Sequence, residues 1–598
     1  MMFVVNAVVV FVLLFLLFGL RNLDFGTIGT VQSIDGDHKT LVVYGPALGG
    51  RTGGPDLERL IRESWPNADM LVPTYSHGWA SNIDPYDITN AIEGAIRDAD
   101  DKYHYEKIIL FGYSGGGLLL RKAYLWGHGL EDRPDTRARG RHPWVDRVDR
   151  FVSLAAPNRG WPNEKPKNLN AYLYAFSYAA RQVGYLTGTG RFIASLMQGS
   201  PFVANMRVQW IDLFRSLKSS PDGRRPLIIH LLGDKDELVD REDSIDLEAG
   251  SPDDVIIKTL EGLSHAEIAA LLYQEDGRTL SPAGEGIQMA LTRTRGEFPP
   301  YWADKVRALQ IDSSIRQLIF VMHGIRDEST WPAEVKRSIE RQIGDRAATV
   351  KIIPPLYRRF AMLPFLLYWD RQENVRWFMD QYTQARAMYP NADTMDFIGH
   401  SNGTYILASA LQRYPVLKVR NVFFAGSVVP TQYDWAGLIS AERVTGRIWN
   451  ICADADWVVA IFPQLFQQIS DLMKLKAEPG LFDIGSAGFH GFRHGAGDEG
   501  RLFNLKYIAG GHGAAFEPAM VGPIATYVAV DPALDFIQRW QPDDRPEPSR
   551  LEFISNLSWL IWIVGISLIV AVGVVAYQFG RVSLLAYGAL LFGLLMTV

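Results

Sequence analysis

Short runs of apolar residues alternate with longer amphipathic stretches along most of the chain. Helix-length stretches such as Tyr86–Asp98 and Gly116–Tyr124 lie between these runs. Nearly continuous hydrophobicity within a short run is typical of strands that are buried on both faces of a parallel sheet. The alternation therefore predicts an α/β fold, with mostly parallel sheets and helices on both faces. The strand-like runs are Thr40–Tyr44, Ile108–Phe111, Phe151–Leu154, Leu227–Leu232, Gln317–Met322, Thr394–Ile398, Val419–Ala425, Arg447–Cys452 and Leu505–Ala509.

The alternation is interrupted once, by a segment rich in proline and charge, and then begins again. Because 598 residues exceed the length of one ordinary domain, we expect two tandem domains. Aromatic helical stretches in residues 161–217 look like an insertion into the first domain. The predicted boundaries are 38–275 for the first domain, 276–314 for a linker, 315–540 for the second domain and 541–553 for a second linker.

Both ends of the chain are strongly apolar. Phe3–Leu20 carries no charge, and a helix of this length just crosses a hydrocarbon core of about 30 Å. We therefore predict a transmembrane helix over residues 1–22. Two further runs, near Leu557–Gly580 and Val582–Val598, are separated by one arginine and predict a transmembrane helical hairpin over residues 554–598. The second of these runs is short, so a re-entrant segment is an open alternative.

The basic residues next to these apolar segments indicate a topology. Most of them lie on the side of the two predicted domains, and by the positive-inside rule this side is the cytoplasm. We therefore expect an integral membrane protein whose two domains are cytoplasmic. The residues on the domain side are Arg21, Lys39, Arg539, Arg545 and Arg550, against Arg581 on the other side.

Composition narrows the possible partners. Apolar residues make up 47% of the chain, and its formal net charge is −6. This balance gives no electrostatic argument for binding nucleic acid. Cys452 is the only cysteine, so no disulfide can form within the chain and no thiolate cluster can hold a metal. We assign no metal and no cofactor.

Each half contains one serine in a Gly-x-Ser-x-Gly motif that directly follows an apolar run. Ser114 lies in GYSGG, and Ser401 lies in GHSNG. In this motif a strand turns sharply into a helix and leaves the serine hydroxyl exposed at the turn. Each serine is followed by an Asp-x-Asp-x-x-Val turn and then by a histidine. The repetition predicts a duplicated site with a serine nucleophile.

Acyl transfer requires a nucleophile, a base, an acid that orients the base and donors for the oxyanion. The second aspartate of each acidic turn is the better candidate, because it lies beyond the strand end where it can reach a histidine; Asp234 and Asp454 are expected to brace the turns. His490 and His494 compete with His512, which alone directly follows an apolar strand. His400 is expected to be a packed residue of the sharp strand-to-helix turn around the serine, called the nucleophile elbow. The expected triads are Ser114, Asp236 and His265 in the first half, and Ser401, Asp456 and His512 in the second.

The oxyanion donors should include the backbone N–H of the residue after each serine, Gly115 and Asn402. A second donor comes from the loop after the first strand. In the second half this is Ile325. In the first half Pro46 has no N–H, so Leu48 or its neighbour Ala47 has to serve, with Leu48 preferred.

Residues 40–275 resemble the lipase-type α/β-hydrolase superfamily through the segments GYSGGGL, LAAPNRG and GDKDELV. Residues 315–530 are similar to it more distantly, through a His-Gly pair after the first strand, GHSNG, and the order of Asp456 and His512. The resemblance implies hydrolysis of an ester or related acyl bond without a cofactor. Hydrolases of this fold place lid helices where residues 161–217 lie, and a lid there would favour a lipid-like substrate. Aromatic helical stretches are, however, more often part of a core, so a core role is the open alternative.

The sequence therefore predicts a membrane-anchored serine hydrolase of the lipase, phospholipase or esterase type, with a lipid or acyl ester as substrate. Two alternatives stay open. One is a thioesterase or peptidase that acts on a soluble substrate. The other is one active domain beside a pseudo-enzyme that binds a partner or a lipid. A membrane scaffold without activity fits poorly with two complete sets of triad residues. The sequence does not indicate the oligomeric state.

Overall fold

The computed structural model divides the chain into two compact units, with the main boundary between Gln310 and Ile311. The predicted helix over residues 1–22 and the predicted oxyanion donor Leu48 lie outside the described residues. The structure describes residues 28–47, 55–75, 81–132, 140–162, 190–220, 224–246, 255–304, 309–325, 331–354, 365–473, 480, 482–498, 500–530 and 548–597.

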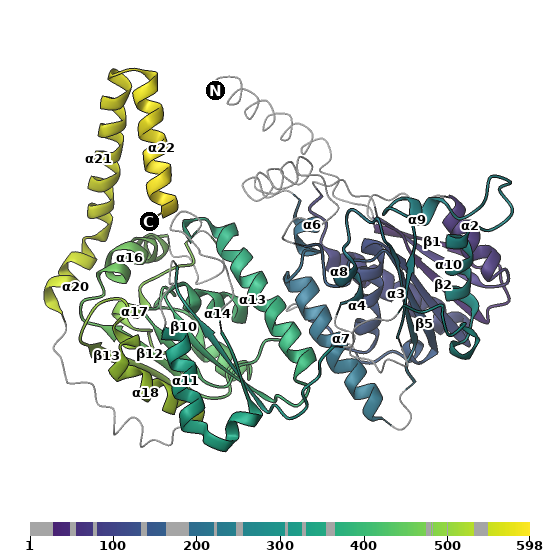
Figure 1. Ribbon diagram of the computed structural model, residues 1–598, viewed down its shortest axis with the longest axis horizontal. Helices are drawn as coiled ribbons and strands as arrows, with labels where there is room; N and C mark the ends of the chain where they lie inside the picture. The colour runs from purple at the N-terminus through teal and green to yellow at the C-terminus, as the bar shows by residue number, and fades with distance from the viewer. Residues whose placement is uncertain are drawn as a thin grey trace. The chain divides into compact units, whose positions relative to one another are not determined.

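The first unit is built around a seven-stranded sheet in the order β1-β3-β2-β4-β5-β6-β7 (Figure 1). β1 pairs antiparallel with β3, and the other neighbours pair parallel. The sheet begins ten residues before the predicted start at residue 38, because the edge strand β1 is partly exposed and has no continuous apolar run. The strands are β1 (Ile28–Ser33), β2 (Thr40–Gly45), β3 (Asp69–Tyr75), β4 (Lys107–Tyr113), β5 (Val148–Leu154), β6 (Leu227–Gly233) and β7 (Val255–Leu260).

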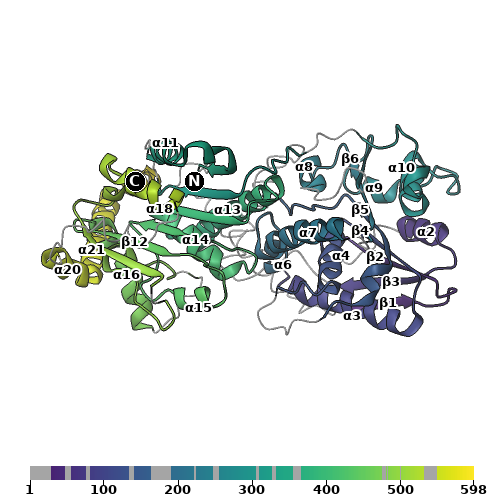
Figure 2. The same cartoon turned by 90° about the horizontal axis from the view of Figure 1, so that it is seen from below.

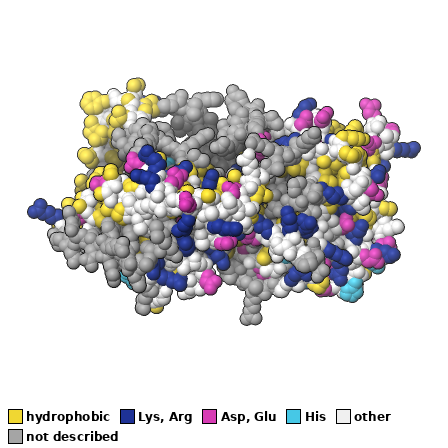
Figure 3. Space-filling view, turned by 60° about the horizontal axis from the view of Figure 1, so that its bottom comes forward, with side chains coloured by type: hydrophobic (Ala, Val, Ile, Leu, Met, Phe, Trp, Pro, Cys, Tyr) yellow, Lys and Arg dark blue, Asp and Glu magenta, His cyan; other side chains and the backbone are white. Residues whose placement is uncertain are grey.

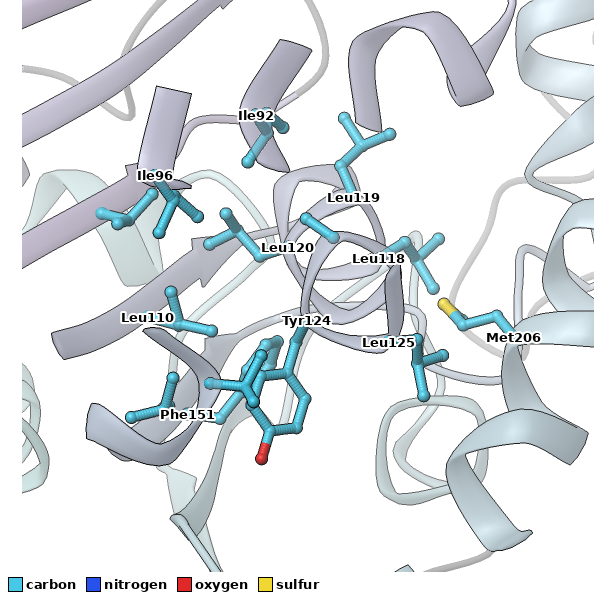
Figure 4. Close-up of a cluster of buried hydrophobic side chains, with 14 of the residues drawn as sticks. Ile92, Ile96, Leu110, Leu118, Leu119, Leu120, Tyr124, Leu125, Phe151 and Met206 are labelled. Carbon is cyan, nitrogen blue, oxygen red and sulfur yellow. The ribbon is translucent and has the colours of Figure 1, made fainter. Parts of the chain in front are cut away.

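Helices cover both faces of this sheet (Figures 1 and 2). One face packs against α2 (Pro55–Ser64), α9 (Glu267–Ala270) and α10 (Pro282–Thr292), and the other packs against α3 (Pro85–Tyr103), α4 (Gly115–Gly127) and α7 (Pro201–Ser219). Figure 4 shows the second of these layers, in which leucines of α4 meet side chains of α3, β4, β5 and α7. The short elements are η1 (Pro143–Arg147), α6 (Arg191–Ser195), α8 (Arg241–Ile245) and η2 (Arg295–Glu297).

Two segments of the first unit contribute helices to its core. The later part of the lid-like insertion 161–217 forms α7, whose Phe202, Trp210 and Phe214 are buried against α4, so this part belongs to the core. Residues 163–189 of the insertion lie outside the described residues. The predicted linker 276–314 contains α10, which Ser281 caps and which also contributes to the core. An apolar helical stripe looks the same in sequence whether it covers a substrate pocket or the core.

The second unit has a six-stranded parallel sheet in the order β13-β12-β11-β10-β8-β9. On one face, Trp331 and Ile339 of α11 (Trp331–Ile343) pack with Ile524 of α18 (Pro518–Val530). On the opposite face, Phe424 contacts Trp435 of α15 (Trp435–Ser440). The strands are β8 (Gln317–Met322), β9 (Val350–Ile353), β10 (Thr394–His400), β11 (Val422–Ala425), β12 (Ile448–Ala453) and β13 (Leu502–Ile508). The other elements are η3 (Gly344–Thr349), α13 (Tyr368–Met388), α14 (Asn402–Arg413), α16 (Trp457–Leu472), α17 (Ala487–His490) and η4 (Ala514–Phe516).

The two sheets repeat one order. The series β2-β4-β5-β6-β7 in the first unit corresponds to β8-β10-β11-β12-β13 in the second, and one further parallel strand flanks β2 or β8. A candidate serine follows the central strand β4 or β10 in each unit. Two mostly parallel sheets with helices on both faces confirm the predicted α/β class.

The C-terminal segment forms α20 (Ser549–Asn556), α21 (Ser558–Gln578) and α22 (Arg581–Thr597). Among the described residues, α21 is the one helix that is long and apolar enough to cross a membrane, with a mean hydropathy of 2.6 and no part of that window buried. Figure 3 shows the hydrophobic side chains of this end of the chain in yellow. The apolar part of α22 is shorter. The Tyr587 hydroxyl of α22 donates to the Ile569 carbonyl of α21 at 2.7 Å, which joins the two helices.

Candidate active site

Both candidate serines lie in a tight turn between a strand and a helix. The φ and ψ angles are 52° and −129° at Ser114, and 51° and −120° at Ser401. Residues other than glycine rarely adopt positive φ, and such strain persists where the surrounding structure enforces it. The N–H of Ser114 donates to the Leu154 carbonyl, and the N–H of Ser401 donates to the Ala425 carbonyl, on the neighbouring strand. The two elbows therefore share one backbone geometry.

The glycines of the motifs are required by close approach of the backbone. A Cβ atom at Gly112 would lie 2.4 Å from the Cα atom of Gly117. One at Gly116 would lie 2.2 Å from the Gly45 carbonyl oxygen, and one at Gly403 would lie 2.4 Å from the Met322 carbonyl oxygen. No side chain fits at these distances. The helix after each serine can therefore pack directly against the end of the neighbouring strand, β2 in the first unit and β8 in the second.

The structure brings Ser114, His265 and Asp236 into a continuous hydrogen-bonded chain. The His265 Nε2 atom lies 3.0 Å from Ser114 Oγ, and its Nδ1 atom lies 2.8 Å from Asp236 Oδ2. The other carboxylate oxygen of Asp236 accepts the backbone N–H groups of Leu238 and Val239, both at 2.9 Å. All three side chains are buried. This arrangement orients the imidazole toward the hydroxyl, as a general base requires.

Tyr113 supports the first site and was not identified from the sequence. Its hydroxyl donates to the His265 carbonyl at 2.8 Å, and its ring stacks on the His265 ring with the centroids 5.6 Å apart. Burial, together with the negative charge of Asp236, raises the pKa of Tyr113 to about 12, so the phenol stays protonated and can donate. The only sequence signal was its position directly before the nucleophile.

In the second unit Asp456 and His512 are within hydrogen-bonding distance of each other. His512 Nδ1 lies 3.1 Å from Asp456 Oδ1 and 3.0 Å from its Oδ2. Asp456 also accepts the Val459 N–H at 3.1 Å, which caps α16. In the part of the chain that the structure describes, no hydrogen bond joins Ser401 Oγ to the His512 ring. Hydrogen bonds to a nucleophile are often loose before substrate binds.

The first aspartate of each acidic turn has a bracing role in the structure. Asp234 accepts the Gly262 N–H at 2.6 Å, and Asp454 accepts the Gly510 N–H at 2.9 Å. Each therefore ties its turn to the loop that carries the histidine. His400 is packed against Phe516, and its Nε2–H donates to the His512 carbonyl at 3.0 Å.

A pocket of about 600 Å³ opens over the second site. Ser401 and His512 lie in its wall together with the predicted oxyanion residue Ile325. Its volume lies in the range that small-molecule sites commonly have, and most of its other side chains are apolar or aromatic. The remaining lining residues are Trp331, Glu334, His400, Val458, Gly513, Phe516, Glu517 and Pro518.

Gly426 allows His512 to occupy its position. The φ angle of Gly426 is +54°, and a Cβ atom there would lie 2.7 Å from His512 Cε1. Ala155 occupies the corresponding position after β5, with φ of 46°. The second site therefore needs a glycine where the first tolerates alanine. Gly426 lies in a segment of small residues, so the sequence alone does not show that a glycine is required at this position.

The oxyanion candidates lie at comparable places in the two units. Gly115 and Asn402 are the first residues of α4 and α14, where backbone N–H groups have no partner within the helix. Ile325 lies in the pocket wall, whereas Leu48 is outside the described residues and its neighbour Ala47 is the last described residue of that loop.

The described part of the chain can also be compared with the requirements of a metal site and of a thiol nucleophile. It contains no group of three or more His, Cys, Asp or Glu side chains that could hold a metal ion. Cys452 is fully buried, and burial raises the pKa of its thiol to about 12, so it is not poised as a nucleophile.

No protein-family model matches the chain, and no curated protein matches it. Among solved structures, it is similar to an alpha/beta hydrolase enzyme from a metagenome of lagoon sediments, with 13% identity, 41% of this chain and 89% of that chain covered, and a TM-score of 0.24. A monoacylglycerol lipase of Paleococcus ferrophilus has 14% identity, covers 40% of this chain over 90% of its own, and has a TM-score of 0.25. Est1E of Butyrivibrio proteoclasticus, solved with bound ferulic acid, has 12% identity, coverages of 45% and 94%, and a TM-score of 0.27. Similarity at this level does not define the chemistry of the site.

Proposed function

We propose that the chain is a membrane-anchored serine hydrolase that cleaves ester bonds of lipid-like substrates. The observation that carries this proposal is the hydrogen-bonded chain from Ser114 through His265 to Asp236, starting at a serine with strained backbone angles. Backbone strain and the burial of a polar hydroxyl both cost free energy, and their coincidence at Ser114 favours a catalytic role.

The proposed mechanism uses an acyl-enzyme. His265 takes the proton of Ser114 while Oγ attacks the substrate carbonyl, and the negative charge of Asp236 stabilises the imidazolium that forms. The N–H of Gly115, with a second donor in the loop at Leu48, stabilises the oxyanion. His265 then protonates the departing alcohol, and the same groups activate a water that releases the acyl group as a carboxylic acid.

The second unit is proposed to work in the same way. Ser401 is the nucleophile, His512 the base, Asp456 the orienting acid, and Asn402 and Ile325 the oxyanion donors. The contact of His512 with Asp456 and the identical elbow angles support this assignment. For His512 to act as the base, the Ser401 hydroxyl has to come within hydrogen-bonding distance of its ring in the substrate complex.

The lipid-like substrate and the membrane location are supported by two features. The pocket around Ser401 is lined mostly by apolar and aromatic side chains, which suits an acyl chain. The helix α21 is apolar along its length and exposed, as a membrane-spanning segment would be. The distribution of basic residues favours a cytoplasmic location of both units.

The alternative with one active and one inactive unit also has an observation in its favour. Within the described residues Ser401 Oγ has no hydrogen bond to His512, whereas Ser114 and His265 are bonded. In this alternative the second unit binds a lipid or partner without turning it over. The first unit then carries the activity.

Labelling with a fluorophosphonate probe in detergent tests the proposal. We expect the wild-type chain to be labelled, Ser114→Ala and Ser401→Ala each to lose part of the label, and the double variant to lose all of it. Ser153→Ala is the matched control, because Ser153 also contacts a histidine, His230, but lies within β5 and not at an elbow. Undiminished labelling of the double variant would remove the enzymatic claim.

A series of nitrophenyl esters tests the substrate class. Turnover should rise with acyl length if the acyl chain enters an apolar pocket, since each buried methylene contributes about 0.8 kcal/mol. Preference for the shortest esters, with hydrolysis of soluble thioesters or peptides, would instead favour the thioesterase or peptidase alternative.

A further inference from the structure

Helix α16 buries polar side chains and leaves large apolar ones exposed, unlike most surface helices of water-soluble domains. Gln464, Gln467 and Ser470 are buried, whereas Trp457 is 64% exposed and Leu472 is 83% exposed. Surface helices normally turn their apolar stripe toward the core and their polar residues outward. In α16 the polar side chains face the protein instead.

The buried polar side chains of α16 are satisfied by hydrogen bonds within the second unit. Gln467 accepts the Thr431 N–H at 3.0 Å and donates to Gln432 Oε1 at 2.6 Å. Gln464 accepts from the Ser486 hydroxyl at 2.6 Å. These hydrogen bonds determine which face of α16 points toward the domain, so the inward orientation of its glutamines is stabilised by specific contacts.

The face of α16 that points away from the domain is mostly apolar: Trp457 and Leu472 are exposed, Ile461 and Leu465 are partly buried, and Gln468 is a polar exception that donates to α20. Trp457, Ile461, Leu465 and Leu472 follow one another at intervals of four, four and seven residues, which places them on one side of a helix. A stripe of this kind in contact with water would be unfavourable. It is favourable where the surrounding solvent is the acyl region of a bilayer.

The stripe is continuous with the helix that is proposed to cross the membrane. The Ser558 hydroxyl and the Trp562 indole N–H of α21 both donate to the Ile461 carbonyl, the latter at 3.4 Å. The rings of Trp562 and Phe462 contact each other with centroids 5.3 Å apart. Figure 1 shows α16 beside the start of α21. The first turn of α21 therefore lies level with α16, at the depth where a spanning helix enters the membrane.

Three tryptophans lie at or near the junction of α16 and α21. Trp559 and Trp562 lie in the first turns of α21, and Trp457 lies at the start of α16. Trp559 is 48% exposed. Tryptophan is enriched at the boundary between lipid and water, because its ring is apolar and its N–H can remain hydrated.

The start of α16 is also part of the second candidate site. Asp456, which holds His512, is the N-cap of α16, and Val458 lines the pocket that contains Ser401. Trp457 lies between these two residues and is exposed. A membrane in contact with the apolar stripe would therefore lie next to the pocket.

We infer that α16 lies in the membrane interface with its apolar stripe among the lipids, and that it brings the Ser401 pocket to the bilayer so that this site takes its ester substrate from a membrane lipid. The membrane contact rests on α16 and its junction with α21, and not on the chemistry of the site. The source of the substrate rests on the proposed function. The two parts can therefore fail separately.

The membrane contact is tested with an environment-sensitive fluorophore at Trp457→Cys, in the full chain reconstituted into phosphatidylcholine vesicles. Cys452 is fully buried, so the label goes to the introduced thiol. Glu340→Cys is the matched control, an exposed position on α11 of the same unit. We expect blue-shifted emission, quenched by brominated lipid, at position 457 and water-like emission at position 340. Water-like emission at both positions would overturn the inference.

The substrate source is tested by the variant L472K/M473K in the S114A background, where the second site alone can react. Met473 is 58% exposed and directly follows α16. We expect hydrolysis of a fluorogenic lipid ester in vesicles to fall about tenfold, as weaker interfacial binding implies, with hydrolysis of a water-soluble short ester changed less than about twofold.

The outcomes separate the two hypotheses. Unchanged hydrolysis of the vesicle ester in this variant would contradict delivery of substrate from the bilayer, and an equal loss on both esters would do so as well. Absence of fluorophosphonate labelling at Ser401 in the starting protein would instead contradict the proposed function of the second unit, and the fluorophore experiment would still decide the membrane contact.

Discussion

At the scale of single residues, the two candidate sites differ in what surrounds the histidine. A Cβ atom at Gly426 would lie 2.7 Å from His512 Cε1, whereas Ala155 at the corresponding place in the first unit accommodates a side chain. The elbow angles of the two serines are nearly identical. Local crowding at the base, more than backbone geometry at the nucleophile, therefore distinguishes the sites.

Gly426→Ala should move the His512 ring and slow the second site. In the S114A background we expect the rate of fluorophosphonate labelling at Ser401 to fall about tenfold or more, since small displacements of a catalytic group have effects of this size. The matched control is Ala155→Gly in the S401A background, where labelling at Ser114 should change less than about twofold. Labelling at the wild-type rate in Gly426→Ala would show that the ring does not need this space.

Residue burial also predicts a pH dependence of stability. Burial lowers the pKa of His490 to about 4, and its Nε2 atom lies 3.0 Å from the Ser555 hydroxyl. The folded state therefore keeps His490 neutral, while the unfolded state binds a proton once the pH falls below the ordinary value of 6.5. The stability from the neutral form is complete above 6.5, and it is lost as the pH falls toward about 4.

His490→Gln should therefore make the second unit less sensitive to acid. Between about pH 7 and pH 4.5 we expect the temperature that abolishes Ser401 labelling to fall less in this variant than in the wild-type chain. The control is His494→Gln, whose side chain is 59% exposed, and it should retain the wild-type slope. A slope in His490→Gln as steep as that of the wild type would contradict the burial argument.

At the scale of elements, helices that look alike in sequence have different surroundings. The segment predicted as a linker contains α10, whose Ala283, Ile287, Ala290 and Leu291 are buried against the first sheet and α2. The segment predicted as a lid ends in α7, which is a core helix. Helix α16 buries Gln464, Gln467 and Ser470 and exposes large apolar side chains. The sequence of each helix contains an apolar stripe, but it does not show which part of the protein or its surroundings contacts that stripe.

Ile287→Ala should destabilise the first unit if α10 belongs to its core. Ile287 is fully buried, and removing such a side chain costs about 2–5 kcal/mol. Loss of Ser114 labelling on heating, in the S401A background, should occur at a lower temperature. Glu285→Ala on the exposed side of the same helix is the control and should behave like the parent. Equal thermal profiles for both variants would indicate that α10 is a linker after all.

At the scale of the whole molecule, the chain repeats one α/β plan twice and adds an apolar end. The strand order β2-β4-β5-β6-β7 recurs as β8-β10-β11-β12-β13, and each serine follows the equivalent strand. Helix α21 is strongly apolar and is also exposed, and the exposure of such a helix to water is unfavourable. The proposed attachment to a membrane would account for this exposure.

Attachment should withstand high salt and alkaline carbonate, because apolar burial and not charge would hold the chain. We expect removal of residues 549–598 together with residues 1–22 to make the protein extractable by carbonate, with Ser114 labelling retained. Removal of residues 1–22 alone should leave it in the membrane through α21, since a span of this length is effectively irreversibly inserted. Release of the full chain by salt alone would contradict a transmembrane hairpin.

The sequence by itself determined the fold class, the two elbows, and the order in which serine, acid and histidine follow one another. These features are local: a buried strand, a glycine-rich turn and a capped acidic turn each depend on a few neighbouring residues. The meeting of Asp236 with His265 and of Asp456 with His512 was predictable from the order of those residues along a repeated plan.

Only the tertiary structure decided what each apolar stripe contacts and how closely side chains approach. It placed α7 and α10 in the core, turned the glutamines of α16 inward, brought Tyr113 against His265 and set Gly426 against His512. The physical reason is that burial depends on residues far away along the chain. Periodicity shows that a helix has an apolar face, but the packing of the whole unit decides whether protein or lipid covers it.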